Sequence, residues 1–456
     1  MNKFFYYLNK ISIIIFIYLL GFLTFKFDLV TKNWLNSSIN LFIEDLNDKS
    51  KNLLLDGLKS LSEDKNSEEF QYFLKKNIGS QSKNLPDKDF ENLMLLSLSK
   101  SKFNNSNFGL FSSPSKKVHS WNFDNTIKPT VMLSIFPDGE VLVYNDKYVS
   151  LISNESEEIW KTKKIIHHWG SIVENKLYVP GRKYANYPED LDENSKKNKI
   201  GKCKVKNALV DTIIIMDLTN GNILDEIDLL PIISSHPFLS KKLGYSKKIF
   251  SRLKTDNDVF KSLFLGPSYC DDLLHLNDIK IIKNEDKKFF KNAKVGDYLL
   301  SLHTINALVL VDHETLKVKW YLRDEFRRQH SPNITKDGML LIFDNKGSDE
   351  RYGESRVIQF DLANKNFDSD FDGNDNFFFD SDIRGRIQIF NDQIYVTSSQ
   401  QGEVFKLNCN DKNLKNCIPE ILFSSLSEGK SNSIFVADFY KKNFFNKEFL
   451  SKIEIK

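Results

Sequence analysis

The stretch from His303 to Asn345, HTINALVLVDHETLKVKWYLRDEFRRQHSPNITKDGMLLIFDN, decides the fold of this chain. Its apolar runs are short and separated by polar turns, a pattern that predicts strand, turn, strand, loop, strand, turn, strand. Lys336-Asp337-Gly338 has the composition of a tight hairpin turn. The loop Arg323–Ser331 between the two hairpins holds three arginines and one histidine. Basic groups therefore gather at a strand edge, where sheet proteins often place binding groups.

The same unit recurs along the chain as an apolar run, a turn with Asp, Asn or Gly, and a second apolar run. The later units are about fifty residues apart, a period typical of propeller blades. A long gap between Tyr184 and Leu274 holds an insertion, and the strand around Val118–Asn122 is expected to close the ring against the last unit. Six unit starts predict an all-β, six-bladed β-propeller over residues 105–456. The units begin near Leu133, Ser171, Asn277, Ser331, Gly385 and Ser433.

Histidines gather at the starts of these units. Of eight histidines in the chain, six lie at unit starts or in the central stretch, and one of these six, His313, is in a polar turn. His168, His275 and His330 each stand just before the first strand of a unit, with His167 and His303 close by in the sequence. The innermost strands of a propeller converge on its axis, so residues at the same position in different blades meet there. The sequence therefore predicts a histidine site at one mouth of the axis.

Two motifs resemble a known family. Gln329–Asn345, QHSPNITKDGMLLIFDN, and Leu299–Asp312, LLSLHTINALVLVD, are similar to segments of the bacterial arylsulfotransferases, and the similarity extends from about Phe108 to about Leu407. Members of that family are six-bladed propellers that move a sulfuryl group between phenols. The resemblance implies a phenolic sulfate donor, a phenolic acceptor and no cofactor. The chain also lacks a phosphate loop and a GxGxxG motif after a strand.

The resemblance also implies roles for single residues. His330 would be the nucleophile that becomes a sulfohistidine, because a neutral imidazole attacks readily near neutral pH. His275 and Asn277 match the family's HxN motif, which binds the sulfuryl group or acts as acid or base. His168 matches a further active-site histidine, and His303 completes the set expected to be catalytic. The residues expected to bind substrate are His167, Asn277, Arg328 and Asn345.

His303 departs from the family, which has an arginine at this position. Imidazole donates a hydrogen bond but is not permanently charged and has no fork of donors. Three consequences stay open: the reaction is more sensitive to pH, Arg328 supplies the missing charge, or activity is lost. An alternative also exists for Asn345, which would cap local backbone groups in a blade turn.

Two other functions compete with an enzyme of this family. The propeller could be a binding module whose histidine cluster has lost catalysis. The converging imidazoles could instead hold Zn or Cu. No pair of cysteines has the CxxC spacing of a thiolate zinc site, and the predicted site contains no metal.

Composition excludes one class of partner and suggests a compartment. The 456 residues carry 64 basic and 61 acidic side chains, a formal net charge of +3, so no nucleic-acid partner is expected. Of four cysteines, Cys409 and Cys417 are eight apart in a polar segment. This spacing suits a small disulfide loop if the domain is exported. Two unrelated thiols are the alternative.

The N-terminal segment predicts attachment to a membrane. Ile11–Phe25 is uncharged and apolar, Lys3 and Lys10 precede it, and no small-x-small cleavage site follows. We expect a signal anchor over residues 1–28, a single pass through a bacterial inner membrane and a propeller in the periplasm. Apolar residues at three- and four-residue steps predict a helical stalk or cap over residues 29–104, running to about Ser99. This helix either packs on the propeller or pairs with a second copy in a homodimer.

Overall fold

The computed structural model describes most of the chain beyond residue 89. The described ranges are 90–98, 108–122, 131–145, 147–186, 207–240, 274–323, 325–345, 355–374, 377–381, 383–409, 411, 413–425 and 433–453. All of them lie in one compact unit, Gln81–Lys456. The expected membrane helix and most of the expected stalk fall outside these ranges. Within them, no helix combines the length and the apolar character needed to span a bilayer.

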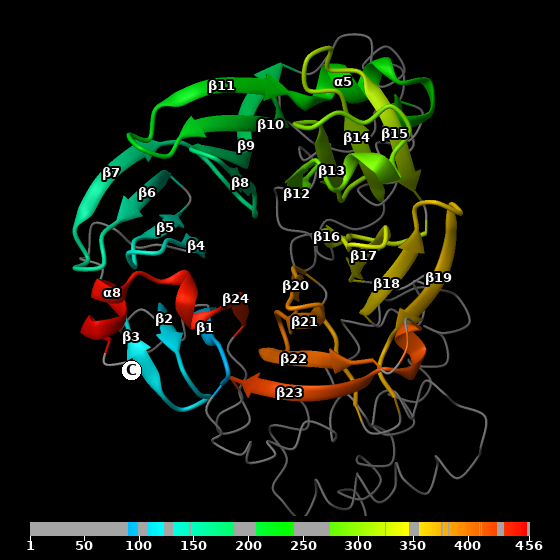
Figure 1. The fold of residues 1–456 in the computed structure, drawn as a ribbon. Helices are drawn as coiled ribbons and strands as arrows, with labels where there is room; N and C mark the ends of the chain where they lie inside the picture. The colour runs from blue at the N-terminus through cyan, green and yellow to red at the C-terminus, as the bar shows by residue number, and fades with distance from the viewer. Residues whose placement is uncertain are drawn as a thin grey trace, which may run out of the picture. The chain divides into compact units, whose positions relative to one another are not determined.

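Six four-stranded antiparallel sheets surround an axis in the described part of the chain (Figure 1). Taken from the innermost strand outward, they are β4 (Val131–Ile135), β5 (Val141–Tyr144), β6 (Tyr148–Ile152) and β7 (Glu158–Lys163); β8 (Ser171–Val173), β9 (Lys176–Asn186), β10 (Asn207–Asp217) and β11 (Ile223–Asp228); β12 (Leu276–Ile281), β13 (Tyr298–Leu302), β14 (Ala307–Val311) and β15 (Val318–Arg323); β16 (His330–Ile334), β17 (Met339–Asp344), β18 (Arg356–Asp361) and β19 (Asn366–Phe371); β20 (Arg386–Phe390), β21 (Gln393–Ser398), β22 (Glu403–Asn408) and β23 (Ile418–Ser424); and β24 (Ile434–Tyr440), β1 (Leu93–Leu98), β2 (Phe108–Phe111) and β3 (Lys117–His119). The α-helices whose two ends lie among the described residues are α5 (Leu229–Ser235) and α8 (Lys447–Lys452), and short 3-10 turns occur at Lys287–Phe289, Leu414–Asn416 and Lys442–Phe444.

This architecture confirms the predicted six-bladed propeller. Each predicted unit start lies in the innermost strand of a blade or one residue before it. The central stretch of the sequence crosses between blades, because β14 and β15 belong to one sheet and β16 and β17 to the next. In the β16–β17 turn, Gly338 has a φ of +89°, and a Cβ there would lie 2.5 Å from the ring of Phe289. Glycine is therefore required at this turn.

One sheet contains both early and late segments of the chain and closes the ring (Figure 1). Its innermost strand, β24, pairs antiparallel with β1, which places Met94 opposite Phe439. The helix predicted to run to about Ser99 is therefore wrong for Leu93–Leu98, and the propeller begins upstream of residue 105. The strand near residues 118–122 does not close the ring either, because β3 is the outermost strand of this sheet.

Burial on both faces of β1 explains why the sequence pattern predicted a helix there. Leu93 and Leu95 pack into one apolar cluster, whereas Met94 and Leu96 pack into another. Successive side chains of a strand point to opposite faces, so a strand with two buried faces is a continuous apolar run. Hydrophobic periodicity does not distinguish such a run from a buried helix segment.

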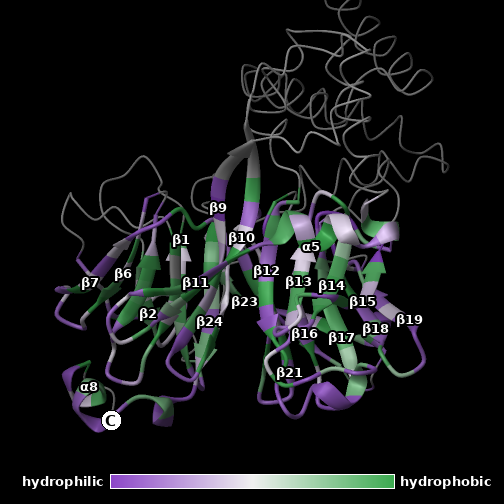
Figure 2. Cartoon of the chain, turned by 90° about the horizontal axis from the view of Figure 1, so that it is seen from above, coloured by the Kyte–Doolittle hydropathy of each residue, from purple (hydrophilic) through white to green (hydrophobic). Residues whose placement is uncertain are grey.

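Apolar side chains fill the spaces between neighbouring blades. Leu308 and Leu310 of β14, for example, share a cluster with Leu340 and Ile342 of β17 in the next sheet. Figure 2 shows hydrophobic residues along the strands and hydrophilic residues at many of the turns. The hairpin of β9 and β10, with eleven residues in each strand, projects beyond the other blades at one end of the axis (Figure 2).

A disulfide joins Cys409 and Cys417, which confirms the predicted bridge. It closes the connection between β22 and β23. Cys417 is buried and packs in a cluster with Leu407 and Leu414. The bridge therefore ties the rim of one blade to its apolar core.

Replacing Cys409 with serine should lower the free energy of unfolding by about 2–3 kcal/mol, because a closed loop of this length restricts the unfolded chain. Urea denaturation of the oxidised wild type and of the Cys409→Ser variant measures the difference. Reduced wild type is the control and should match the variant. Equal stability of oxidised and reduced wild type would contradict the prediction.

Candidate functional site

The innermost strands of three blades begin at one mouth of the axis, and histidines meet there. His168 lies just before β8, His275 directly precedes β12, and His330 begins β16. Nε2 of His168 lies 3.2 Å from Nε2 of His275. The ring centroids of His168 and His330 are 5.2 Å apart, and those of His275 and His303 are 4.7 Å apart. The structure thus brings together the four histidines expected to be catalytic, and their roles stay predictions.

The backbone is unusual at this mouth. His275, Arg328, Ser331 and Arg384 have φ angles of 53°, 53°, 51° and 65°. Non-glycine residues pay an energetic cost in this left-handed region, and such residues concentrate at functional sites. His275 is held there by its backbone N–H, which donates to Oδ2 of Asp211 at 2.8 Å. The strained turns aim consecutive residues at the axis.

A chain of hydrogen bonds orients His330. Nδ2 of Asn345 donates to the carbonyl of Ser381 at 2.6 Å and to that of Arg384. Because both amide protons are committed, Oδ1 of Asn345 faces His330 and accepts from Nδ1 at 2.7 Å. The proton of a neutral His330 ring therefore lies on Nδ1. Its Nε2 carries a lone pair, is buried and has no hydrogen-bond partner among the described residues.

Burial keeps these imidazoles neutral. It lowers the pKa of His330 to about 3, although the hydrogen bond with Asn345 acts in the opposite direction. It lowers the pKa of His167 to about 4, with the nearby charge of Arg182 as the second cause. The pKa values of His168 and His303 lie well below the usual value, again through burial first and then through neighbouring histidines. At neutral pH these four rings are uncharged.

A buried carboxylate that the sequence analysis missed organises the cluster. Asp211 lies on β10, directly opposite Arg182 on β9. Its Oδ1 is 3.0 Å from Nε2 of His167 and accepts from Nε of Arg182 at 3.4 Å and from the backbone N–H of Leu276 at 3.2 Å. Burial would raise the pKa of Asp211, but His167 and Arg182 outweigh it and hold the pKa well below its ordinary range. The carboxylate is therefore ionised and joins two blades.

The sequence contained a signal for Asp211. It is the one acidic residue in the apolar run from Val210 to Met216. A charged residue inside a strand buried on both faces is rare unless it is paired. Its partners, Arg182 and His275, are distant in sequence, so the pairing itself was not visible.

The residues expected to bind substrate have different surroundings. Nδ2 of Asn277 donates to the backbone carbonyl of Gln329 at 2.7 Å, while its buried Oδ1 has no partner within the described ranges. The backbone N–H of Arg328 donates to Oδ1 of Asn306 at 3.2 Å. His167 is hydrogen-bonded to Asp211. Asn345 is hydrogen-bonded to His330. The contacts of Asn345 suit orientation of His330, and the expected binding of substrate by these residues stays a prediction.

His303 does not provide the charge of the family's arginine, because it is uncharged at neutral pH. Its buried Nδ1 has no partner among the described residues. The charges of Arg328 and Arg182 both act on His303, and that of Arg384 acts on His330. Permanent positive charge at this mouth therefore comes from arginines of three separate segments.

The hydrogen bonds do not fit a metal ion. Nitrogens of His167, His168 and His275 lie within 4.8 Å of one another. However, Nη2 of Arg182 is 2.9 Å from Nδ1 of His275 and can only donate. The proton of a neutral His275 therefore lies on Nε2, the atom that faces His168. A metal ligand needs a lone pair at that position, so one of the three nitrogens is unsuited to the ion.

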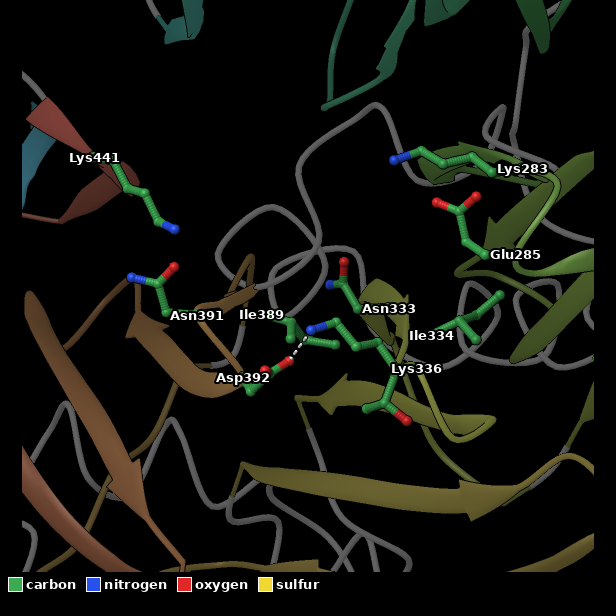
Figure 3. Close-up of a pocket in the computed structure, with 10 residues that line it drawn as sticks. Lys283, Glu285, Asn333, Ile334, Lys336, Ile389, Asn391, Asp392 and Lys441 are labelled. Atoms are coloured by element: carbon green, nitrogen blue, oxygen red, sulfur yellow. Dashed lines mark ion pairs between the residues drawn. The ribbon is translucent and has the colours of Figure 1, made fainter. Parts of the chain in front are cut away.

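A separate cavity of about 650 Å³ lies where the innermost strands end, opposite the histidines (Figure 3). Its walls include Asn333, Ile389 and Lys441. Lys336 and Asp392 face each other across it in an ion pair of 2.6 Å, with side chains 85% and 70% exposed. Solvated, paired charges of this kind contribute little, and no unpartnered buried polar atom lies among its lining residues. The histidine mouth is the better candidate site.

The fold and the site together define a class of protein: a six-bladed propeller with neutral imidazoles beside arginines at one axial mouth, where Nε2 of His330 has an open lone pair. This arrangement suits transfer of an anionic group through a histidine nucleophile. The family model described as arylsulfotransferase (ASST) matches residues 132–416. The chain therefore belongs to the arylsulfotransferase (ASST) family, which implies a sulfotransferase enzyme acting on aryl sulfates.

Several solved structures are similar to this chain at low sequence identity. A protein of unknown function from Bacteroides caccae is 10% identical with a TM-score of 0.39, over 73% of this chain and 97% of that one. The Pan2 WD40 domain of Neurospora crassa is 10% identical with a TM-score of 0.37, over 71% of this chain and 76% of that domain. AztD of Citrobacter koseri is 11% identical with a TM-score of 0.33, over 69% of this chain and 75% of that one. These values are too low to bear on function, and no curated protein matches the sequence.

The neutral histidines should make stability depend on pH. Their pKa values are lowered in the folded protein, so between about pH 6.5 and pH 4 the unfolded chain binds more protons. Stability is complete above pH 6.5 and is lost as pH falls, by about 1.4 kcal/mol per histidine at one unit below that value. Urea denaturation at pH 7.5 and 5.5 measures the loss, and His168→Gln should reduce it. Equal unfolding free energies at the two pH values would contradict the prediction.

Proposed function

We propose that this protein moves a sulfuryl group from a phenolic sulfate ester to a phenolic acceptor through a sulfohistidine at His330. The observation that carries the proposal is Nε2 of His330, which is buried, unprotonated and without a partner in the described part of the chain. Membership of the arylsulfotransferase (ASST) family supports the same reaction class. Both the geometry and the family therefore favour an enzyme over a binding module.

In the first half-reaction, Nε2 of His330 attacks the sulfur of the donor ester. An N–S bond forms, the S–O bond to the donor breaks, and the electron pair leaves on the phenolic oxygen. Positive charge develops on the imidazole ring, and the hydrogen bond from Nδ1 to Asn345 stabilises it. Because that hydrogen bond already exists, Asn345 needs no reorientation during the step.

In the second half-reaction, the oxygen of the acceptor phenol attacks the sulfur of the sulfohistidine. The N–S bond breaks, and its electron pair returns to Nε2 of His330. The acceptor loses its phenolic proton, and the enzyme is restored. This ping-pong sequence needs no cofactor, in keeping with the donor being an ester already activated for transfer.

Positive charge for the sulfuryl oxygens would come from arginines. A sulfate monoester carries one negative charge, and attraction to a cation is strong where water is excluded. Arg328 and Arg182 act electrostatically on His303, and Arg384 acts on His168 and His330. We propose that this surrounding charge replaces the arginine that the family has at position 303.

The proposed setting is the periplasm, with residues 1–28 as an anchor in the bacterial inner membrane. The uncharged segment Ile11–Phe25 supports an anchor. The disulfide between Cys409 and Cys417 suits an oxidising compartment. Protease added to spheroplasts should digest the propeller, and full protection of the propeller in intact spheroplasts would contradict this placement.

His330→Ala should abolish sulfuryl transfer from 4-nitrophenyl sulfate to phenol, because Nε2 of His330 is the atom that attacks the sulfur in the proposed mechanism. Intact-mass spectrometry of donor-treated protein should show one added SO₃ group on the wild type and none on the variant. Asn345→Ala should lower the rate by about tenfold to a hundredfold, since it removes the oxygen that accepts the hydrogen bond from Nδ1 of His330. His313→Ala, at a histidine outside the cluster, is the control. Wild-type transfer by His330→Ala would favour the binding-module alternative.

A further inference from the structure

Arg182 and Asp211, which had no predicted role, meet the histidine cluster at His275. We infer that Arg182, fixed by Asp211, holds His275 in the tautomer with its single proton on Nε2, so that His275 serves the reaction as a hydrogen-bond donor and not as a proton donor. This inference rests on the proposed function and decides between the two roles that the HxN motif left open. Arg182 and Asp211 are positioning residues in this scheme.

The contact at His275 settles the tautomer. Nη2 of Arg182 lies 2.9 Å from Nδ1 of His275. A guanidinium group has only donors and stays charged at any ordinary pH, so Nδ1 must accept. The ring proton then lies on Nε2 and points to Nε2 of His168 at 3.2 Å. Nε2 of His168 accepts in turn, which places the proton of that ring on Nδ1.

One carboxylate holds both members of this contact. Asp211 is 1% exposed, and Arg182, directly opposite it in the sheet, is 14% exposed. Oδ1 of Asp211 accepts from Nε of Arg182 at 3.4 Å, and Oδ2 accepts from the backbone N–H of His275 at 2.8 Å. The guanidinium group and the imidazole it contacts are thus fixed from a common point across two blades. The arrangement is built into the fold before any substrate enters.

This tautomer limits the chemistry of His275. An imidazole with one proton that gave it up completely would become an anion, which is inaccessible near neutral pH. When substrate binds, the ring can give the hydrogen bond from Nε2, which His168 accepts in the free protein, to a sulfuryl oxygen or to the leaving oxygen instead. Neutral imidazoles stabilise developing negative charge in this way elsewhere. His275 would therefore lower the barrier electrostatically, with no proton transferred.

The proton balance of the reaction follows from this limit. The donor phenol leaves as its phenolate, which takes a proton from water outside the site. The acceptor reacts as a phenolate and has lost its proton to a base in solution, water or buffer. Bonds to sulfur are exchanged as described above, and His275 begins and ends each half-reaction with the same proton.

The tautomer can be measured in the free enzyme without any turnover. Nitrogen-15 NMR of histidine-labelled protein at pH 7 distinguishes protonated from bare ring nitrogens, and His275→Gln assigns the signals. We expect a protonated Nε2 and a bare Nδ1 at His275. A protonated Nδ1 would overturn the inference, whether or not sulfuryl transfer occurs.

Kinetics provide a second, independent test. Release of phenol from phenyl sulfate in a single turnover should be equally fast in H₂O and D₂O, and release from 4-nitrophenyl sulfate should be far faster because its phenolate is more stable. A solvent isotope effect of about twofold or more on this step would show that a proton is transferred in it and would overturn the inference. Formation of the sulfohistidine would still support the proposed function. Absence of the sulfohistidine would instead refute the proposed function.

Variants at Arg182 separate positioning from simple stability. Arg182→Met should lower the single-turnover rate on the order of tenfold to a hundredfold and introduce the other tautomer of His275. Arg182→Lys keeps a charged donor and should recover most of the rate and the original tautomer. Lys183→Met, which removes the next cation along β9 and its exposed ion pair with Asp228, is the matched control. Wild-type rate and tautomer in Arg182→Met would overturn the inference.

Discussion

Closure of the ring depends on one antiparallel pairing, between β24 near the C-terminal end of the described residues and β1 near their beginning. β24 is an innermost strand and contacts β20 on one side and β4 on the other. Once it is in place, every innermost strand has two neighbours around the axis. The starts of β8, β12 and β16 then meet at one mouth. β12 also contacts β8 and β16 directly, so closure completes the ring around a site that neighbouring blades bring together.

The chemistry of the site depends on imidazoles that stay neutral and on which nitrogen of each ring carries the proton. Burial keeps the ring of His330 neutral, and fixed partners determine which nitrogen of each ring carries the proton. Oδ1 of Asn345 accepts a hydrogen bond from Nδ1 of His330, and Nε2 of that ring stays open. Arg182 occupies Nδ1 of His275 and leaves the proton on Nε2. In the proposed mechanism, these different proton positions make His330 the nucleophile and His275 a hydrogen-bond donor.

The positive charge of the site is distributed over several arginines, which we propose compensates for the histidine at position 303. Arg182 comes from β9, Arg328 from the loop after β15, and Arg384 from the segment before β20. A permanent cation is therefore present on more than one side of the cluster, and a neutral ring at His303 does not leave the mouth uncharged. Asp211, buried beside Arg182, offsets part of this charge and holds it in place. The positive field depends on the fold as a whole more than on any one motif.

The sequence by itself determined the six strand–turn–strand units, the family, the disulfide and the histidines that meet at the axis. These features are encoded locally, in apolar periodicity, turn residues and short motifs such as the one ending at Asn345. Only the tertiary structure decided that Leu93–Leu98 is a strand, because a run buried on both faces has no distinguishing period. It alone also decided the contacts of Asp211 with Arg182 and His275. Those contacts join residues 29 and 64 positions apart, so sheet register and the packing of neighbouring blades, which no local pattern records, bring them together.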